Sequence, residues 1–117
     1  MILTEKETTA IKDLQTQEKS CIEKYNRYSS EAKDTVLQDL FKSLEKEEQE
    51  HYQSLGKVLS GTVPTCNCND NDGKRYDPPA TYNAMTENND KKNDCFLATD
   101  CIGTEKMVSS EYNSNVL

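Results

Sequence analysis

The sequence has no apolar run near the length of about eighteen residues that a membrane-spanning helix requires. Its first ten residues, MILTEKETTA, lack the basic and apolar regions of a secretory signal peptide. We therefore expect a protein that is made in a cytoplasm and is not inserted into a membrane.

Apolar side chains and positive charge are both scarce. Hydrophobic residues make up 33% of the 117 residues, Trp is absent, and the mean hydropathy is −0.92. Such a composition can cover the facing sides of two or three helices within at most one domain. The net charge of −7 and the pI near 4.7 argue against nucleic acid or an anionic membrane surface as a partner.

The cysteines do not form an even set, which argues against a closed disulfide framework of the kind found in small secreted proteins. We expect reduced thiols, or thiols that are cross-linked after synthesis. The five cysteines are Cys21, Cys66, Cys68, Cys95 and Cys101.

The first half of the chain carries two patterns of helical spacing. Thr4 and Glu7 form a capping-box motif, which predicts a first helix within residues 4–32. Asp34 is a suitable N-cap for a second helix within 34–59, and Gly61 is a suitable C-cap. The predicted buried positions recur every three or four residues. They are Ile11, Leu14, Glu18, Cys21, Tyr25, Tyr28 and Ala32 in the first helix, and Leu37, Phe41, Leu44, Glu48, His51, Leu55 and Val58 in the second.

Acidic side chains interrupt both apolar patterns. Burying an ionised carboxylate is costly unless it is paired or bound to a cation. Glu48 and His51, the only histidine, form the Glu-x-x-His arrangement that carboxylate-bridged di-iron and di-manganese bundles use. In an antiparallel hairpin that turns at Lys33, Glu18 lies level with Glu48. We interpret Glu45, Glu47 and Glu50 as solvated charges.

Residues 60–94 have no helical periodicity. They contain all three prolines, seven Asn and five Asp, which predicts an irregular crossover from one end of a bundle to the other. Within it, Cys66 and Cys68 are weak evidence for a soft metal site because no second pair of thiols accompanies them. The run from Cys68 to Pro79 does not form a calcium loop, because it begins with Cys and ends with Pro where a Glu is needed.

A third helix is predicted within residues 95–117, with Asp94 as its N-cap. Its predicted buried positions are Ala98, Cys101, Glu105, Val108, Tyr112 and Val116 or Asn115. Gly103 weakens this helix by about 1 kcal/mol relative to Ala.

The third helix repeats the first at an offset of 87 residues. Glu18-Lys19 and Tyr25-Asn26 recur as Glu105-Lys106 and Tyr112-Asn113, and Asp13 recurs as Asp100. A duplicated hairpin would place a second Glu-x-x-His near position 135, beyond Leu117. The chain is then either a truncated four-helix protein or one that completes its bundle with another chain. Tyr25 and Tyr112 occupy equivalent positions, where they pack in the core or donate hydrogen bonds to the acids.

The order Glu18, Glu48-x-x-His51, a long crossover and Glu105 resembles the ferritin-like superfamily, and rubrerythrin-type hairpins in particular. The local sequence is similar to the coat F family of bacterial spore coat proteins, which share that fold. The similar segments are EKEEQEHYQSL, the Cys-, Asn- and Pro-rich connection that follows it, and DCFLATDCIGTEKMVSSEYN. The resemblance covers residues 1–59 and 94–117. It implies an all-α, incomplete four-helix bundle within a single domain, synthesis in the mother-cell cytoplasm, and deposition in the spore coat.

Two functions of different class follow. The first is a structural spore coat protein that assembles with itself or with other coat proteins through cross-linking, with or without a residual metal site. The second is a ferritin-like oxidase or peroxidase completed by oligomerisation, with Fe or Mn held by Glu18, Glu48, His51 and Glu105. We favour the first, because one Glu-x-x-His supplies only half of a dinuclear site.

Overall fold

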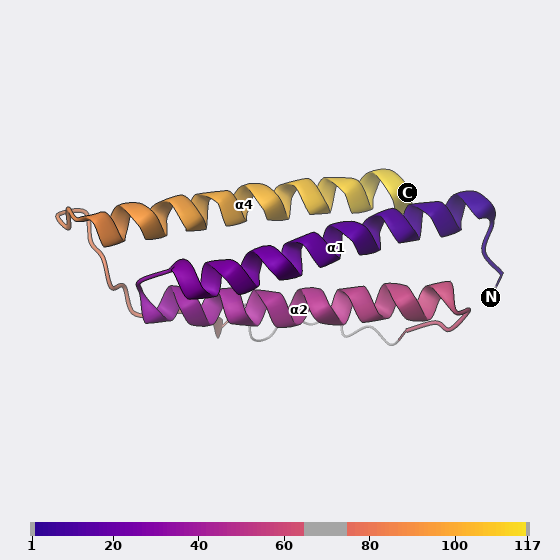
Figure 1. The fold of residues 1–117 in the computed structure, drawn as a ribbon, viewed down its shortest axis with the longest axis horizontal. Helices are drawn as coiled ribbons and strands as arrows, with labels where there is room; N and C mark the ends of the chain where they lie inside the picture. The colour runs from indigo at the N-terminus through magenta and orange to yellow at the C-terminus, as the bar shows by residue number, and fades with distance from the viewer. Residues whose placement is uncertain (1, 65–74, 117) are drawn as a thin grey trace.

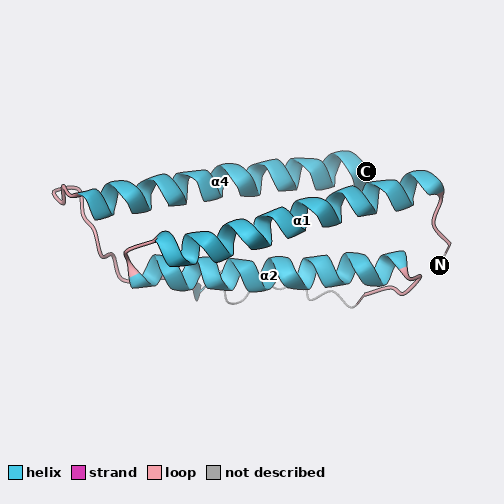
Figure 2. Cartoon of the chain, viewed as in Figure 1, coloured by secondary structure: helices cyan, strands magenta, loops and turns pink. Residues whose placement is uncertain are grey.

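The computed structural model describes residues 2–64 and 75–116, apart from the side chains of residues 111 and 113–116. Within these ranges the chain forms helices and no strand, as Figure 2 shows. The helices are α1 (Glu5–Glu31), α2 (Thr35–Leu59) and α4 (Asn89–Val116). The all-α fold class predicted from the helical spacing is confirmed.

The helices lie side by side in an elongated molecule of 56 × 25 × 23 Å (Figure 1). A short turn joins α1 to α2, and the two pack as an antiparallel hairpin. Helix α4 runs along α1 on the side away from α2 in this view, antiparallel to α1. Helix α2 ends at one end of the molecule and α4 begins at the other, so the two ends of the predicted crossover lie at opposite ends of the bundle.

The ends of α1 and α2 follow the predicted capping chemistry. The Thr4 hydroxyl accepts from the Glu7 N–H at 3.1 Å and the Glu7 carboxylate accepts from the Thr4 N–H at 2.9 Å, which completes the capping box. Asp34 caps α2 by accepting from the Val36 N–H at 3.3 Å. Gly61 follows the C-cap residue Ser60 with a φ of 89°, a left-handed conformation that glycine adopts at little cost.

The predicted start of the third helix is wrong. Helix α4 begins at Asn89, where the Asn88 side chain accepts from the Lys91 N–H at 2.8 Å. Asp94 therefore lies inside the helix and is 3% exposed. Its carboxylate accepts instead from the backbone N–H groups of Lys33 and Asp34 at 2.9 and 2.8 Å, so it ties α4 to the turn between α1 and α2.

An aromatic cluster forms the centre of the core between the first two helices. Phe41 is fully buried, with its ring stacked on Tyr25 at 6.2 Å and edge-on to Tyr28 at 5.5 Å between centroids. All predicted buried positions of α1 are buried except Ile11, which is half-buried. In α2 only Phe41 and Glu48 are buried, and the other predicted positions are half-buried or, for His51, exposed.

The contact between α1 and α4 is largely polar. Lys24 donates to Asp100 at 2.7 Å and to the Thr104 hydroxyl at 2.7 Å, and Tyr28 donates to Asp100 at 2.5 Å. The buried residues that α4 contributes to the core are Leu97, Cys101 and Val108. Helix α4 is thus positioned by specific hydrogen bonds more than by an extensive apolar surface.

Candidate metal centre

Two glutamates are buried at the interface between α1 and α2. Glu18 is 0% exposed and Glu48 is 4% exposed. The antiparallel pairing of the hairpin brings them to the same level, as the symmetry about Lys33 predicts. Because burial removes these carboxylates from water, each of their oxygen atoms needs a partner.

One oxygen atom of each glutamate lacks a hydrogen bond. The Oε2 atoms of both Glu18 and Glu48 are buried and accept no hydrogen bond. His51 Nδ1 lies 3.5 Å from Glu48 Oε2 and 3.8 Å from Glu18 Oε2. One ligand atom from each of the three residues lies within 4.8 Å of the others. Such a convergence of unpartnered carboxylate oxygens and an imidazole fits a bound cation.

His51 lies at the edge of this group, with its side chain 56% exposed. Interaction with Glu18 raises its pKa above the ordinary value and outweighs the opposing effect of burial. The buried Glu18 carboxylate therefore favours the imidazolium form when no metal is present. A metal ion would replace that proton, because only the neutral imidazole offers a lone pair to a metal.

Glu105 is not part of the three-residue group. It is half-buried on α4, where its Oε1 accepts from the Tyr25 hydroxyl at 2.5 Å. Glu105 nevertheless contributes to the raised pKa of His51, so its charge acts on the group. Its role as a metal ligand stays a prediction.

Two tyrosine–glutamate hydrogen bonds match the internal sequence repeat. Tyr25 of α1 donates to Glu105 of α4, and Tyr112 of α4 donates to Glu18 Oε1 of α1 at 2.7 Å. Since each pair is the repeat-equivalent of the other, α1 and α4 contact each other through two reciprocal hydrogen bonds. The hydrogen-bonding role considered for both tyrosines is thus observed, and Tyr25 is also a core residue.

Sequence reasoning misassigned one acidic residue near the group. The interpretation of Glu45 as a solvated charge is wrong, because its side chain is half-buried and its Oε2 is a buried atom without a hydrogen-bond partner. Its Oε1 accepts only a long hydrogen bond of 3.4 Å from Asn26. Its position beside the apolar stripe, one turn before Glu48, was the available signal.

Of the cysteines in the described residues, two are buried and one is exposed to solvent. Cys21 and Cys101 are 4% and 8% exposed, and burial is the main reason that their pKa values are raised, to about 11 for Cys21. Cys95 is exposed. Cys66 and Cys68, and most of the sequence considered as a calcium loop, lie outside the described residues.

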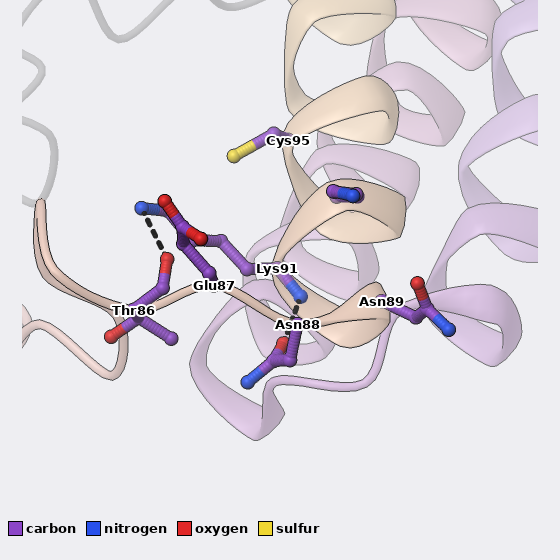
Figure 3. Close-up of a pocket in the computed structure, with 7 residues that line it drawn as sticks. Thr86, Glu87, Asn88, Asn89, Lys91 and Cys95 are labelled. Atoms are coloured by element: carbon purple, nitrogen blue, oxygen red, sulfur yellow. Dashed lines mark hydrogen bonds between the residues drawn. The ribbon is translucent and has the colours of Figure 1, made fainter.

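A cavity lies away from this group, at the end of the bundle where α4 begins (Figure 3). It is an open space of about 610 Å³. Lys91 Nζ donates to the backbone carbonyls of Asn83 and Thr86 at 2.7 and 3.0 Å. This amine therefore fixes the segment that leads into α4. The residues that line the cavity are Thr86, Glu87, Asn88, Asn89, Lys91, Lys92 and Cys95.

Comparisons with known proteins do not assign a family. No family model matches the chain, and neither the curated proteins nor the solved structures contain a match. None of the helices in the described part of the chain has the length and apolarity needed to cross a membrane.

Proposed function

We propose that this chain binds a divalent metal ion through Glu18, Glu48 and His51. The observation that carries the proposal is the pair of buried Oε2 atoms that accept no hydrogen bond. A cation would supply the missing partner for both atoms, and His51 Nδ1 lies within reach of the same position. Two carboxylates and one imidazole favour ions of intermediate to hard character, which supports Mn or Fe over copper(I).

We further propose that the ion stabilises a helical scaffold that works by assembly, as in the spore coat proteins that the sequence resembles. The support is the sequence resemblance together with the small core, the elongated shape and the exposed Cys95. In this role the metal site stabilises the hairpin, and the chain is made in the mother-cell cytoplasm before it joins the coat.

The alternative is a ferritin-like oxidase or peroxidase. The observation that favours it is the exposure of His51, which leaves one side of the site open to a substrate or to ligands from another chain. That function requires Glu105 and a second Glu-x-x-His to complete a dinuclear centre. When bound, the two metal ions would supply the redox chemistry, while the residues of this chain would bind and orient them.

Metal stoichiometry tests the site. We expect about one Mn²⁺ per chain after anaerobic reconstitution and desalting, measured by elemental analysis and by electron paramagnetic resonance. His51→Ala and Glu48→Gln should abolish retention. Glu50→Gln is a matched control, because Glu50 is exposed and neighbours the site in sequence only.

If the His51→Ala and Glu48→Gln variants retain as much metal as the control, then these residues are not metal ligands and the proposal is wrong. Two ions per pair of chains, bound only in a dimer and also lost in Glu105→Gln, would favour the enzymatic alternative.

A further inference from the structure

Glu18 is shared between the candidate metal centre and the contact of α4 with α1. Its Oε1 accepts from Tyr112 of α4 at 2.7 Å, while its unpartnered Oε2 belongs to the group with Glu48 and His51. The hydrogen bond to Oε1 restricts the rotation of the carboxylate. Docking of α4 therefore holds the other oxygen where an ion would meet it.

The charge distribution acts in the same direction. Docking of α4 also brings Glu105 against α1, the helix that carries Glu18, where its carboxylate accepts from the Tyr25 hydroxyl at 2.5 Å. Without a cation, the negative charges of Glu18, Glu48 and Glu105 oppose this approach. A bound divalent cation would reduce that repulsion and would favour the docked position of α4.

The contact that these charges act on also covers two thiols. Cys21 of α1 and Cys101 of α4 are buried within the same core cluster as Tyr25. A cavity of about 290 Å³ between α1 and α4 is lined in part by Cys21 and Met107, which places Cys21 on the side of α1 that faces α4. Separation of α4 from α1 would expose both thiols to solvent.

We propose that ion binding at Glu18, Glu48 and His51 and docking of α4 stabilise each other through Glu18, so that the ion controls access to Cys21 and Cys101. This inference rests on the proposed metal site. The coupling is reciprocal by thermodynamic necessity: docking of α4 raises the affinity for the ion by the same factor by which the ion favours docking. The bound ion thus acts as a gate, which here means that it lowers the rate at which solutes react with Cys21 and Cys101.

Site-resolved alkylation measures the gate directly. The full-length chain is treated with N-ethylmaleimide in the presence of a chelator or of saturating Mn²⁺, and the rate at each cysteine is followed by mass spectrometry. Mn²⁺ is chosen because it prefers carboxylate and imidazole ligands to thiolates. We expect Mn²⁺ to slow alkylation of Cys21 and Cys101 by about tenfold, a typical coupling factor, and to leave the exposed Cys95 unchanged.

Two matched tyrosine variants locate the coupling. Tyr112→Phe removes the hydroxyl that contacts Glu18, and should reduce both the protection by Mn²⁺ and the affinity for Mn²⁺. Tyr28→Phe removes a hydrogen bond of the same kind, from α1 to Asp100 of α4, away from the three ligands. It should speed alkylation in the chelator but preserve the protection factor. Equal loss of protection in both variants would contradict a path through Glu18.

The failures of the two proposals are distinguishable. If Mn²⁺ binds, as shown by its resonance signal, but Cys21 and Cys101 react at the same rate with and without it, then the coupling is wrong and the metal site stands. If Mn²⁺ is not bound at all, then the proposed function fails and this inference fails with it.

Discussion

Glu48 illustrates how a single buried carboxylate can oppose stability. It is 4% exposed and its Oε2 has no hydrogen-bond partner. We predict that Glu48→Gln raises the free energy of unfolding of the metal-free protein by about 1–2 kcal/mol, because a neutral amide of the same shape is less costly to bury. Urea denaturation in the presence of a chelator measures this change. A destabilised Glu48→Gln variant would mean that the charge is already compensated without a cation.

Asp94 is a buried carboxylate in the opposite situation. Burial alone would raise its pKa, but hydrogen bonds from the Lys33 backbone, the Tyr82 hydroxyl and the Asp34 backbone together hold the pKa below its ordinary value. Its folded-state pKa is therefore lower than its unfolded-state pKa. The resulting stabilisation is present above the ordinary Asp pKa of about 3.9 and is lost as the pH falls through the lower folded-state value.

We predict that Asp94→Asn lowers the free energy of unfolding by about 1–3 kcal/mol at pH 7, because it leaves at least one backbone N–H of the turn with a poorer partner. The difference from the unmodified protein should shrink below pH 4. Paired urea titrations at pH 7 and pH 3 test this, with the exposed Asp90→Asn as a control. A difference that is independent of pH would show that charge is not involved.

Helix α4 is the element whose local sequence is weakest. Gly103 lies within it, and a Cβ added there would have no heavy atom within 4 Å. We predict that Gly103→Ala stabilises the protein by about 0.5–1 kcal/mol, because alanine loses less backbone entropy on forming a helix. Thermal unfolding followed by circular dichroism measures the gain.

The glycine after α2 provides the contrasting control. Gly61 has a φ of 89°, so Gly61→Ala should destabilise the protein. If Gly61→Ala destabilises the protein but Gly103→Ala leaves its stability unchanged, then α4 does not contribute to the cooperative unfolding of the bundle.

The boundaries of the elements show what local sequence can and cannot predict. The ends of α1 and α2 were predictable within a residue, because Thr4, Asp34 and Gly61 act on backbone groups a few residues away. The start of α4 was not. Its first turns contain no apolar residue that would reveal a period, and the side chain of Asp94 binds a turn some sixty residues earlier.

At the scale of the whole molecule, the metal site predicts ligand-dependent stability. An ion that binds only the folded chain adds about 2.7 kcal/mol to the free energy of unfolding when its free concentration is a hundred times the Kd. We predict that Mn²⁺ raises the unfolding temperature in proportion to the logarithm of its concentration, measured by calorimetry. Glu50→Gln should behave like the unmodified chain and Glu48→Gln should show no shift. An equal shift in Glu48→Gln would place the stabilising ion at another site.

The sequence by itself determined the helical hairpin and the level pairing of Glu18 with Glu48. Both follow from three- and four-residue spacing and from symmetry about Lys33, which are local properties of an antiparallel helix pair. Only the tertiary structure decided that His51 lies at an open edge, that Asp94 binds the turn at Lys33, and that Tyr112 holds Glu18. These contacts depend on where α4 docks, and docking is set by hydrogen bonds between residues far apart in the chain, which no local period encodes.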